Sequence, residues 1–192
     1  MINQAFNCVK HFIKQNDIDE SHAIKHSMEV MRFATAIYHS ELASNPHLSA
    51  HLTIIIAAAI LHDMCDHKYV PSESDAIRQI RDFMSGHLTS RELDVIVSII
   101  TTMSYSKVKE NGYPDLGEYQ LAYHIVREAD LLAAYDMDRC TIFGMFVNDL
   151  EYTTAVARAT ELYNTRVMRY ISDGLFITEF SKRVSLELQN KI

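Results

Sequence analysis

The stretch LTIIIAAAILHDMCDHKY, residues 52–69, changes character at its midpoint. Its first ten residues are almost entirely apolar, which predicts a helix buried on all sides at the centre of the fold. The remaining eight include His62, Asp63, Asp66 and Lys68. Such a helix either ends at the surface or delivers imidazole and carboxylate groups to an internal site, and the rest of the sequence bears on that choice.

Apolar residues recur at helical spacing along nearly the whole chain, and 5 Gly and 3 Pro leave few positions for the turns of a sheet. We therefore predict an all-α fold, a compact multi-helix bundle. At 192 residues and 48% hydrophobic composition, the chain suits one domain over 1–192. The expected helices cover about 2–15, 21–42, 50–64, a segment opening at Ser72, a segment opening after Thr89, 118–136, and two or three closing helices over 138–192.

One predicted helix and one predicted loop rest on local signals. LDVIVSII (93–100) has the β-branched residues of a strand, but Thr89 and Glu92 have the spacing of a capping box, which favours a helix. The segment 104–119 is rich in turn residues and is the longest predicted loop.

Charge and cysteine content narrow the classes of partner. The 25 acidic and 18 basic residues give a net charge of −7 without a dense basic run, which argues against duplex nucleic acid as a partner. Cys8, Cys65 and Cys140 are odd in number and form no C-x-x-C, so reduced thiols in a cytoplasmic protein are expected. No apolar run approaches the ~20 residues of a membrane span, and no targeting segment is recognised. The sequence leaves open whether the chain forms a homodimer.

Two further segments carry polar groups on apolar backgrounds. His22 and His26 are four residues apart, hence on one face of the second predicted helix, and His26 is expected at its buried stripe. Asp130 lies within IVREADLLAA (125–134), where an unpaired carboxylate would be costly. Two imidazoles and two carboxylates suit Mn²⁺, Fe²⁺, Co²⁺, Ni²⁺ or Mg²⁺. The predicted ligands of this divalent ion are His26, His62, Asp63 and Asp130.

The pattern H…HD…D in a helical chain resembles the HD-domain metal-dependent phosphohydrolase superfamily. The resemblance is carried by KHSMEVMRFA (25–34), AAILHDMCDHKY (58–69) and IVREADLLAAYDMDRC (125–140). It implies an HD-domain bundle with a metal-site core at about 20–145 and closing helices at 146–192, and it implies the same four ligands. SHAIKH (21–26) and LHDMCDHKY (61–69) resemble a small stand-alone group that includes nucleotide pyrophosphohydrolases.

The chain departs from that group outside the metal set. Glu29 stands where the group often has an Arg, three residues after the first metal histidine. The group also tends to show the string DADRLDA near the last ligand, where this chain has EADLLAA (128–134). Glu128 and Ala133 thus replace Asp residues, and Leu131 replaces an Arg.

The expected chemistry assigns roles to five further side chains. A divalent ion would lower the pKa of a bound water and polarise a phosphoryl oxygen. Asp66 is expected to orient that water, and His22 to contact the leaving phosphate or act as an acid. Lys68, Lys107 and Arg139 are candidates for binding phosphate oxygens. In the simpler interpretations, Asp66 caps a turn, the lysines are solvated, and Arg139 pairs with a nearby carboxylate.

These observations predict a divalent-metal-dependent phosphohydrolase acting on a small phosphorylated substrate, with a nucleotide expected and either pyrophosphate or phosphate leaving. One alternative is a di-iron oxygenase of the HD type, which needs about two more imidazoles and therefore depends on His87 and His124. The other alternative is a non-catalytic module that binds a metal and senses a nucleotide without turnover.

Overall fold

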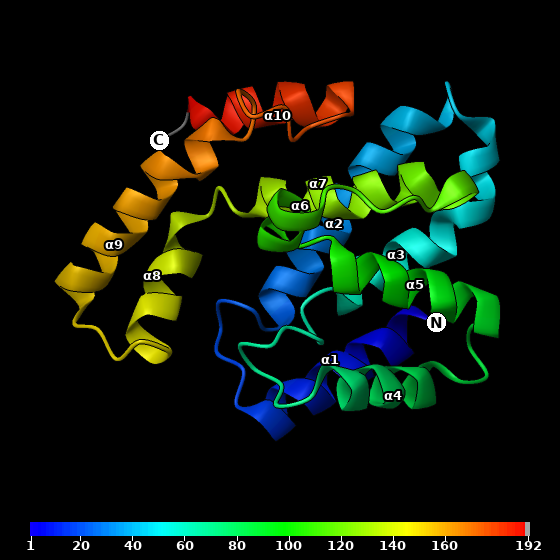
Figure 1. Ribbon diagram of the computed structural model, residues 1–192, viewed down its shortest axis with the longest axis horizontal. Helices are drawn as coiled ribbons and strands as arrows, with labels where there is room; N and C mark the ends of the chain where they lie inside the picture. Colours follow the sequence, from blue (N-terminus) through cyan, green and yellow to red (C-terminus); the bar gives the residue numbers. More distant parts are fainter. Residues whose placement is uncertain (191–192) are drawn as a thin grey trace.

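The fold is built from helices throughout the part of the chain that is described, as the sequence predicts. The computed structural model describes residues 1–190, which form ten α-helices and three short 3₁₀ segments (Figure 1). The α-helices are α1 (Ile2–Asn16), α2 (Ile24–Leu42), α3 (Leu52–Leu61), α4 (Glu73–Met84), α5 (Ser90–Thr102), α6 (Tyr105–Asn111), α7 (Gln120–Ala133), α8 (Met137–Phe146), α9 (Tyr152–Thr165) and α10 (Glu179–Gln189). The 3₁₀ segments are η1 (Pro46–His51), η2 (Gly117–Tyr119) and η3 (Val167–Arg169).

Helix α3 lies at the centre of the molecule. Its residues from Ile54 to Leu61 are all buried, and it packs against α1, α2, α5 and α7. A fully buried Ile or Leu side chain stabilises a fold by about 1.5–3 kcal/mol, and α3 buries four Ile and one Leu together with three small Ala residues, so it contributes strongly to the core. Helices α2 and α7 also pack on each other, so that three site-bearing segments meet in one region.

The caps predicted from sequence are present. The Thr89 side chain accepts from the backbone N–H of Glu92, whose carboxylate accepts from the backbone N–H of Thr89. Ser72 likewise accepts from Asp75 at the start of α4. LDVIVSII therefore lies in helix α5, not in a strand, because a satisfied capping box fixes the first turn.

Several predicted boundaries are wrong, among them those of the helix expected over 118–136, which begins at Gln120 and ends at Ala133. The segment 104–119 is not a continuous loop, since it contains α6, which Ser104 caps, and η2. α6 has no buried residue, so it leaves no apolar periodicity in the sequence. The helix expected over 50–64 ends at Leu61, and the one expected from residue 21 begins at Ile24.

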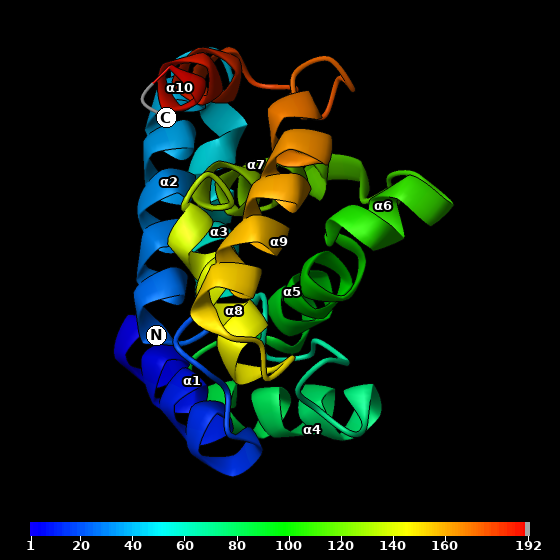
Figure 2. The same cartoon turned by 90° about the vertical axis from the view of Figure 1, so that its left-hand side faces the viewer.

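The closing part of the chain forms three helices. Helices α8 and α9 pack on each other and stand to one side of the bundle in Figure 1, while α10 returns over α7 and α2. Figure 2 shows α9 across from α6 and α5. Within residues 1–190, no helix has both the length and the apolar character needed to cross a membrane.

Candidate metal centre

Four predicted ligands come from three segments of the core. His26 lies in the first turn of α2 and Asp130 in the second half of α7. His62 and Asp63 follow the last residue of α3, where the chain leaves the helix in a turn closed by the Met64 N–H to Leu61 carbonyl bond. Because adjacent helical residues point about 100° apart, this turn lets both members of the doublet face one region.

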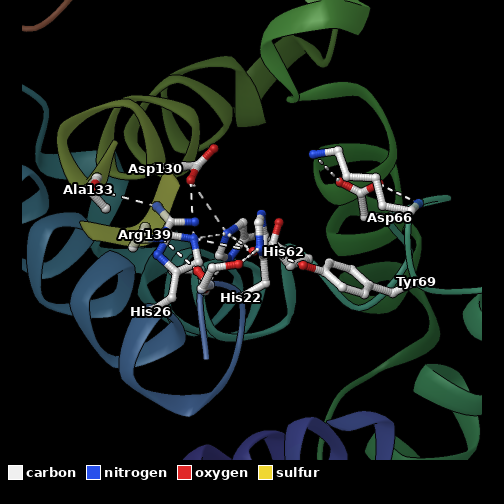
Figure 3. Close-up of polar contacts among 12 residues, drawn as sticks. His22, His26, His62, Asp66, Tyr69, Asp130, Ala133 and Arg139 are labelled. Carbon is white, nitrogen blue, oxygen red and sulfur yellow. Dashed lines mark hydrogen bonds and ion pairs between the residues drawn. The ribbon is translucent and has the colours of Figure 1, made fainter. Parts of the chain in front are cut away.

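The ligand atoms of these side chains lie close together (Figure 3). The Nε2 atoms of His26 and His62 are 2.9 Å apart. Asp130 Oδ1 lies 3.4 Å from the first and 3.6 Å from the second. Among residues 1–190, these three side chains form a group whose ligand atoms are all within 4.8 Å of one another. Asp63 Oδ2 lies outside that group but is 3.3 Å from His26 Nε2 and 3.1 Å from His62 Nε2.

These spacings suit atoms that share one small cation. Ligand atoms about 2.1 Å from an ion are about 3.0 Å apart at a right angle and about 3.4 Å apart at the tetrahedral angle. The imidazoles are nearly inaccessible, with side chains 1% and 2% exposed. Among the partners offered by residues 1–190, Asp63 Oδ2 is buried without a hydrogen bond of good geometry, which is costly for a carboxylate oxygen. A divalent ion would satisfy it, so the donor set fits a metal.

A hydrogen bond fixes which nitrogen of the His62 ring faces the ligand group, and nearby charges change the pKa of the ring. Its Nδ1 lies 2.9 Å from the Ala59 carbonyl oxygen, which can only accept, so Nδ1 carries a proton and donates it. This leaves Nε2 directed at the ligand group. A metal-bound histidine usually donates its other ring N–H to a carbonyl or carboxylate oxygen, as His62 does here. Burial opposes a charged ring, but the carboxylates of Asp63 and Asp130 raise the pKa of His62 to about 10.

The pKa values of the two carboxyl groups, Asp63 and Asp130, shift downward, in the opposite direction to that of His62. Burial alone would raise the pKa of each. The imidazoles of His62 and His22 outweigh burial at Asp63, and the imidazoles of His26 and His62, 3.4 and 3.6 Å from Oδ1, outweigh it at Asp130. The pKa values of both carboxyl groups therefore lie well below the usual range, and the group offers two anionic oxygens at neutral pH.

The ligand group opens into a cavity of about 670 Å³. Helices α5 to α9 and the turn after α3 contribute to its walls, and α9 lies opposite α6 (Figure 2). Cavities of about 300–1,000 Å³ accommodate small organic ligands and cofactors. The charged side chains that line it are of both signs. Five are lysine or arginine, namely Lys68, Lys107, Arg139, Arg158 and Arg166, and five are carboxylates, namely Asp63, Asp66, Asp130, Asp136 and Glu161.

Asp66 and Lys68 lie in the cavity wall but contact each other. Asp66 Oδ1 accepts from the Lys68 backbone N–H at 2.9 Å, and Oδ2 lies 3.4 Å from Lys68 Nζ. Figure 3 shows Asp66 set apart from the imidazole pair. Asp66 thus has the turn-capping contact that the simpler interpretation expects. Lys68 is 5.7 Å from the centre of the Phe143 ring in the same wall.

The other predicted phosphate contacts also have protein partners. Lys107 donates to Glu73 Oε2 at 2.9 Å and to the Thr101 carbonyl at 2.7 Å. Arg139 Nε donates to the Ser21 carbonyl at 2.7 Å, and neither Asp136 nor Asp138 pairs with it. Lys25 contacts Asp136 instead, at 3.4 Å. Arg139 therefore keeps its net charge in the cavity wall without a carboxylate partner among residues 1–190.

His22 lies beside the ligand group although it precedes helix α2. Its ring centre is 6.0 Å from that of His26, and its Nδ1 lies 2.8 Å from Tyr69 Oη and 2.6 Å from Ser21 Oγ. Burial lowers the pKa of His22 to about 4, despite the nearby Asp63 carboxylate, so the ring is neutral at neutral pH. Its side chain lines the cavity.

His87 and His124, the two histidines that a second iron would need, lie outside the group of proposed ligands. His87 is exposed in the turn before α5, and His124 contacts Gln120 and Tyr113 on the first half of α7. Neither belongs to a metal-sized group of His, Cys, Asp or Glu within residues 1–190. The geometry therefore does not supply the imidazoles on which the di-iron alternative depends.

Sequence reasoning missed several cavity residues. Arg158 and Arg166 lie on or just after α9, and the Arg166 guanidinium is 4.0 Å from the centre of the Tyr105 ring. Their positions depend on how α9 packs, and no local motif marks them. Tyr69 is part of the quoted doublet segment, so its position was available in the sequence, but only the fold brings it to His22.

Comparison with known proteins adds a fold match. Neither models of known families nor curated proteins match the chain. The fold is similar to the crystal structure of a Lactobacillus plantarum protein determined as a Northeast Structural Genomics target, with a TM-score of 0.73 and 20% sequence identity. The match covers 97% of this chain and 88% of the other. At this identity, the likeness concerns the fold.

Proposed function

We propose that the protein is a divalent-metal-dependent phosphohydrolase of the HD-domain type, acting on a small phosphorylated substrate of nucleotide size. The observation that carries the proposal is the convergence of His26, His62, Asp63 and Asp130 at one end of a cavity whose walls also include Arg139 and other basic side chains. The order of these residues in the chain also matches the superfamily pattern that the sequence resembles.

The chain's own residues define what the site can do. The two imidazoles and two carboxylates would hold the ion, which would supply electrophilic stabilisation to a phosphoryl oxygen and acidify a water. Arg139 would bind an anionic oxygen, since it lines the cavity and its charge is not neutralised by a carboxylate. Lys68 also lines the cavity and would contribute charge there, and Asp66 would hold Lys68 in place.

The substrate class follows from size and charge. A cavity of about 670 Å³ is larger than a phosphate group requires, so the phosphorylated molecule has a further portion. Tyr105 and Phe143 lie in the cavity wall and offer aromatic surface for that portion. Arg158 and Arg166 add positive charge along α9, which suits a substrate with more than one anionic oxygen group.

The test is a turnover screen of the full chain loaded with Mn²⁺. Nucleoside mono-, di- and triphosphates are supplied in turn, and both phosphate and pyrophosphate are measured. We expect release of one of these products, with activity lost in Asp130→Asn. Bound Mn²⁺ without turnover of any phosphorylated compound would contradict the proposal, and tight nucleotide binding in that case would favour a sensor.

A further inference from the structure

A short chain of hydrogen bonds ends on His22 beside the proposed metal ligands (Figure 3). Tyr69 Oη donates to Asp19 Oδ2 at 2.8 Å and lies 2.8 Å from His22 Nδ1. The other carboxylate oxygen, Asp19 Oδ1, accepts from the backbone N–H of Ser21 at 2.8 Å. Residues before α2 and residues after α3 are thereby joined through one tyrosine hydroxyl.

The number of protons available along this series of hydrogen bonds determines the tautomer of His22. A phenol has one proton, and here Tyr69 gives it to the Asp19 carboxylate, which can only accept. The Tyr69 oxygen therefore meets His22 Nδ1 as an acceptor, so Nδ1 must carry the proton of the neutral ring. Ser21 Oγ, 2.6 Å from the same nitrogen, can rotate to accept as well.

The opposite ring nitrogen is then an acceptor. Within residues 1–190, His22 Nε2 makes no hydrogen bond, whereas Nδ1 makes two contacts. The His22 side chain lines the cavity that contains His62 and Asp130. Its Nε2 lone pair is thus available to a molecule or water in that cavity.

We propose that Asp19 and Tyr69 are positioning residues that hold His22 as the Nδ1–H tautomer, so that Nε2 accepts a hydrogen bond inside the cavity. In the proposed phosphohydrolase, the donor to Nε2 is the attacking water, and that part of the inference rests on the proposed function. The assignment of the His22 tautomer does not depend on the proposed function. His22 then acts as an acceptor, the opposite of the acid role expected from the sequence.

A single isosteric change should invert the tautomer. In Asp19→Asn, the amide oxygen must face the Ser21 N–H, because that backbone group can only donate. The amide NH₂ then occupies the position of Oδ2 and donates to Tyr69 Oη. Tyr69 must turn its own proton toward His22 Nδ1, which moves the ring proton to Nε2.

Nitrogen-15 NMR of the labelled full chain measures this directly. Mg²⁺ is added because it is diamagnetic, and the His22 signals are identified by their loss in His22→Gln. We expect Nδ1–H in the wild type and Nε2–H in Asp19→Asn. Asp17→Asn is the matched control, since Asp17 is exposed, makes no side-chain hydrogen bond within the described part of the chain and lies two residues away. Nε2–H in the wild type, or Nδ1–H retained in folded Asp19→Asn, would overturn the assignment.

A second variant covers the case in which Asp19→Asn does not fold. In Tyr69→Phe, the acceptor oxygen is gone and Ser21 Oγ can either donate or accept, so both tautomers of His22 should be populated. A single Nδ1–H tautomer there would contradict a positioning role for Tyr69. Tyr163→Phe, which removes a buried hydroxyl without a partner, should leave the His22 signals unchanged.

Turnover separates the catalytic part from the structural part. In Asp19→Asn we expect kcat to fall about 100-fold, the low end for a positioned proton acceptor. KM and Mn²⁺ content should stay near wild-type values. Full kcat with an inverted tautomer would overturn the catalytic role of His22 Nε2. If the wild type turns over no phosphorylated compound, the proposed function fails while the NMR result still decides the tautomer.

Discussion

At the residue scale, the 2.9 Å distance between the Nε2 atoms of His26 and His62 defines the site. Two bare lone pairs at this distance repel, and two protons do not fit between them. Without an ion, one proton must lie there, which agrees with the raised pKa of His62. Metal binding at these atoms therefore has to displace a proton.

This gives a pH-dependent prediction. At pH 8, between the ordinary pKa of 6.5 and the raised value of about 10, the metal-free site holds a proton on His62. Mn²⁺ binding should then release about one proton, and the apparent affinity should rise with pH toward 10. Calorimetric titration in two buffers of different ionisation enthalpy counts the released protons. Binding without proton release would contradict the assignment of His62 as a ligand.

The same pKa shifts set the pH range in which the metal-free site stabilises the fold. The contribution of His62 is complete below pH 6.5 and is lost as pH rises through about 10, because its folded pKa is raised. The contributions of Asp63 and Asp130 are present above about pH 4 and are lost as pH falls below, because their folded pKa values are lowered.

At the element scale, Glu128 joins α7 to the start of α10. Its buried carboxylate accepts from the backbone N–H of Ile177, from the backbone N–H of Thr178 and from the Thr178 hydroxyl. It does not face the metal site. The longer side chain, in place of the Asp found in related strings, therefore has a structural explanation here.

Removing this charge should weaken the attachment of α10. Glu128→Gln places an amide NH₂ against backbone donors, so we expect a loss of about 2–4 kcal/mol in the free energy of unfolding. Urea denaturation measures it. Glu179→Gln changes an exposed carboxylate that pairs with Lys182, and it should cost less than about 0.5 kcal/mol. Equal effects of the two substitutions would contradict the role assigned to Glu128.

The contact of α8 with α9 shapes one wall of the cavity. A Cβ added at Gly144 would lie 3.1 Å from Ala155 Cβ, so a larger residue must push the helices apart. Both residues line the cavity. Gly144→Ala should raise KM several-fold while Mn²⁺ binding stays unchanged. The free energy of unfolding should change by about 1 kcal/mol or less, because gained helix propensity offsets overpacking. Unchanged KM would show that α9 does not contact substrate.

The sequence predicts those elements whose signals are local. The capping box at Thr89 identifies α5, and the apolar run of α3 identifies the central helix. It misses α6, which has no fully buried residue among those described, and it extends α3 to about residue 64 instead of Leu61, because periodicity does not record where a helix unwinds. Polar residues on apolar segments indicated the four proposed ligands. The contact of Tyr69 with His22 spans 47 residues and required the fold.

At the scale of the whole molecule, an ion at the site would bind α2, α7 and the turn after α3 to one another. These segments surround the core, so the ion should stabilise the entire fold. At 100 times its Kd, Mn²⁺ would add about 2.7 kcal/mol to the free energy of unfolding. For a chain of this size we expect Tm to rise by about 5–11 °C. Calorimetric scans of the wild type and Asp130→Asn measure it, and equal shifts in both would contradict the site.

The most direct test of the central claim is Mn²⁺ binding by the purified full chain, followed by electron paramagnetic resonance. We expect a saturable site near one ion per chain in the wild type, and its loss in folded Asp63→Ala. The exposed-carboxylate variant Asp17→Asn should bind like the wild type. Saturable binding that survives Asp63→Ala with undiminished affinity would contradict a shared ion at His26, His62, Asp63 and Asp130.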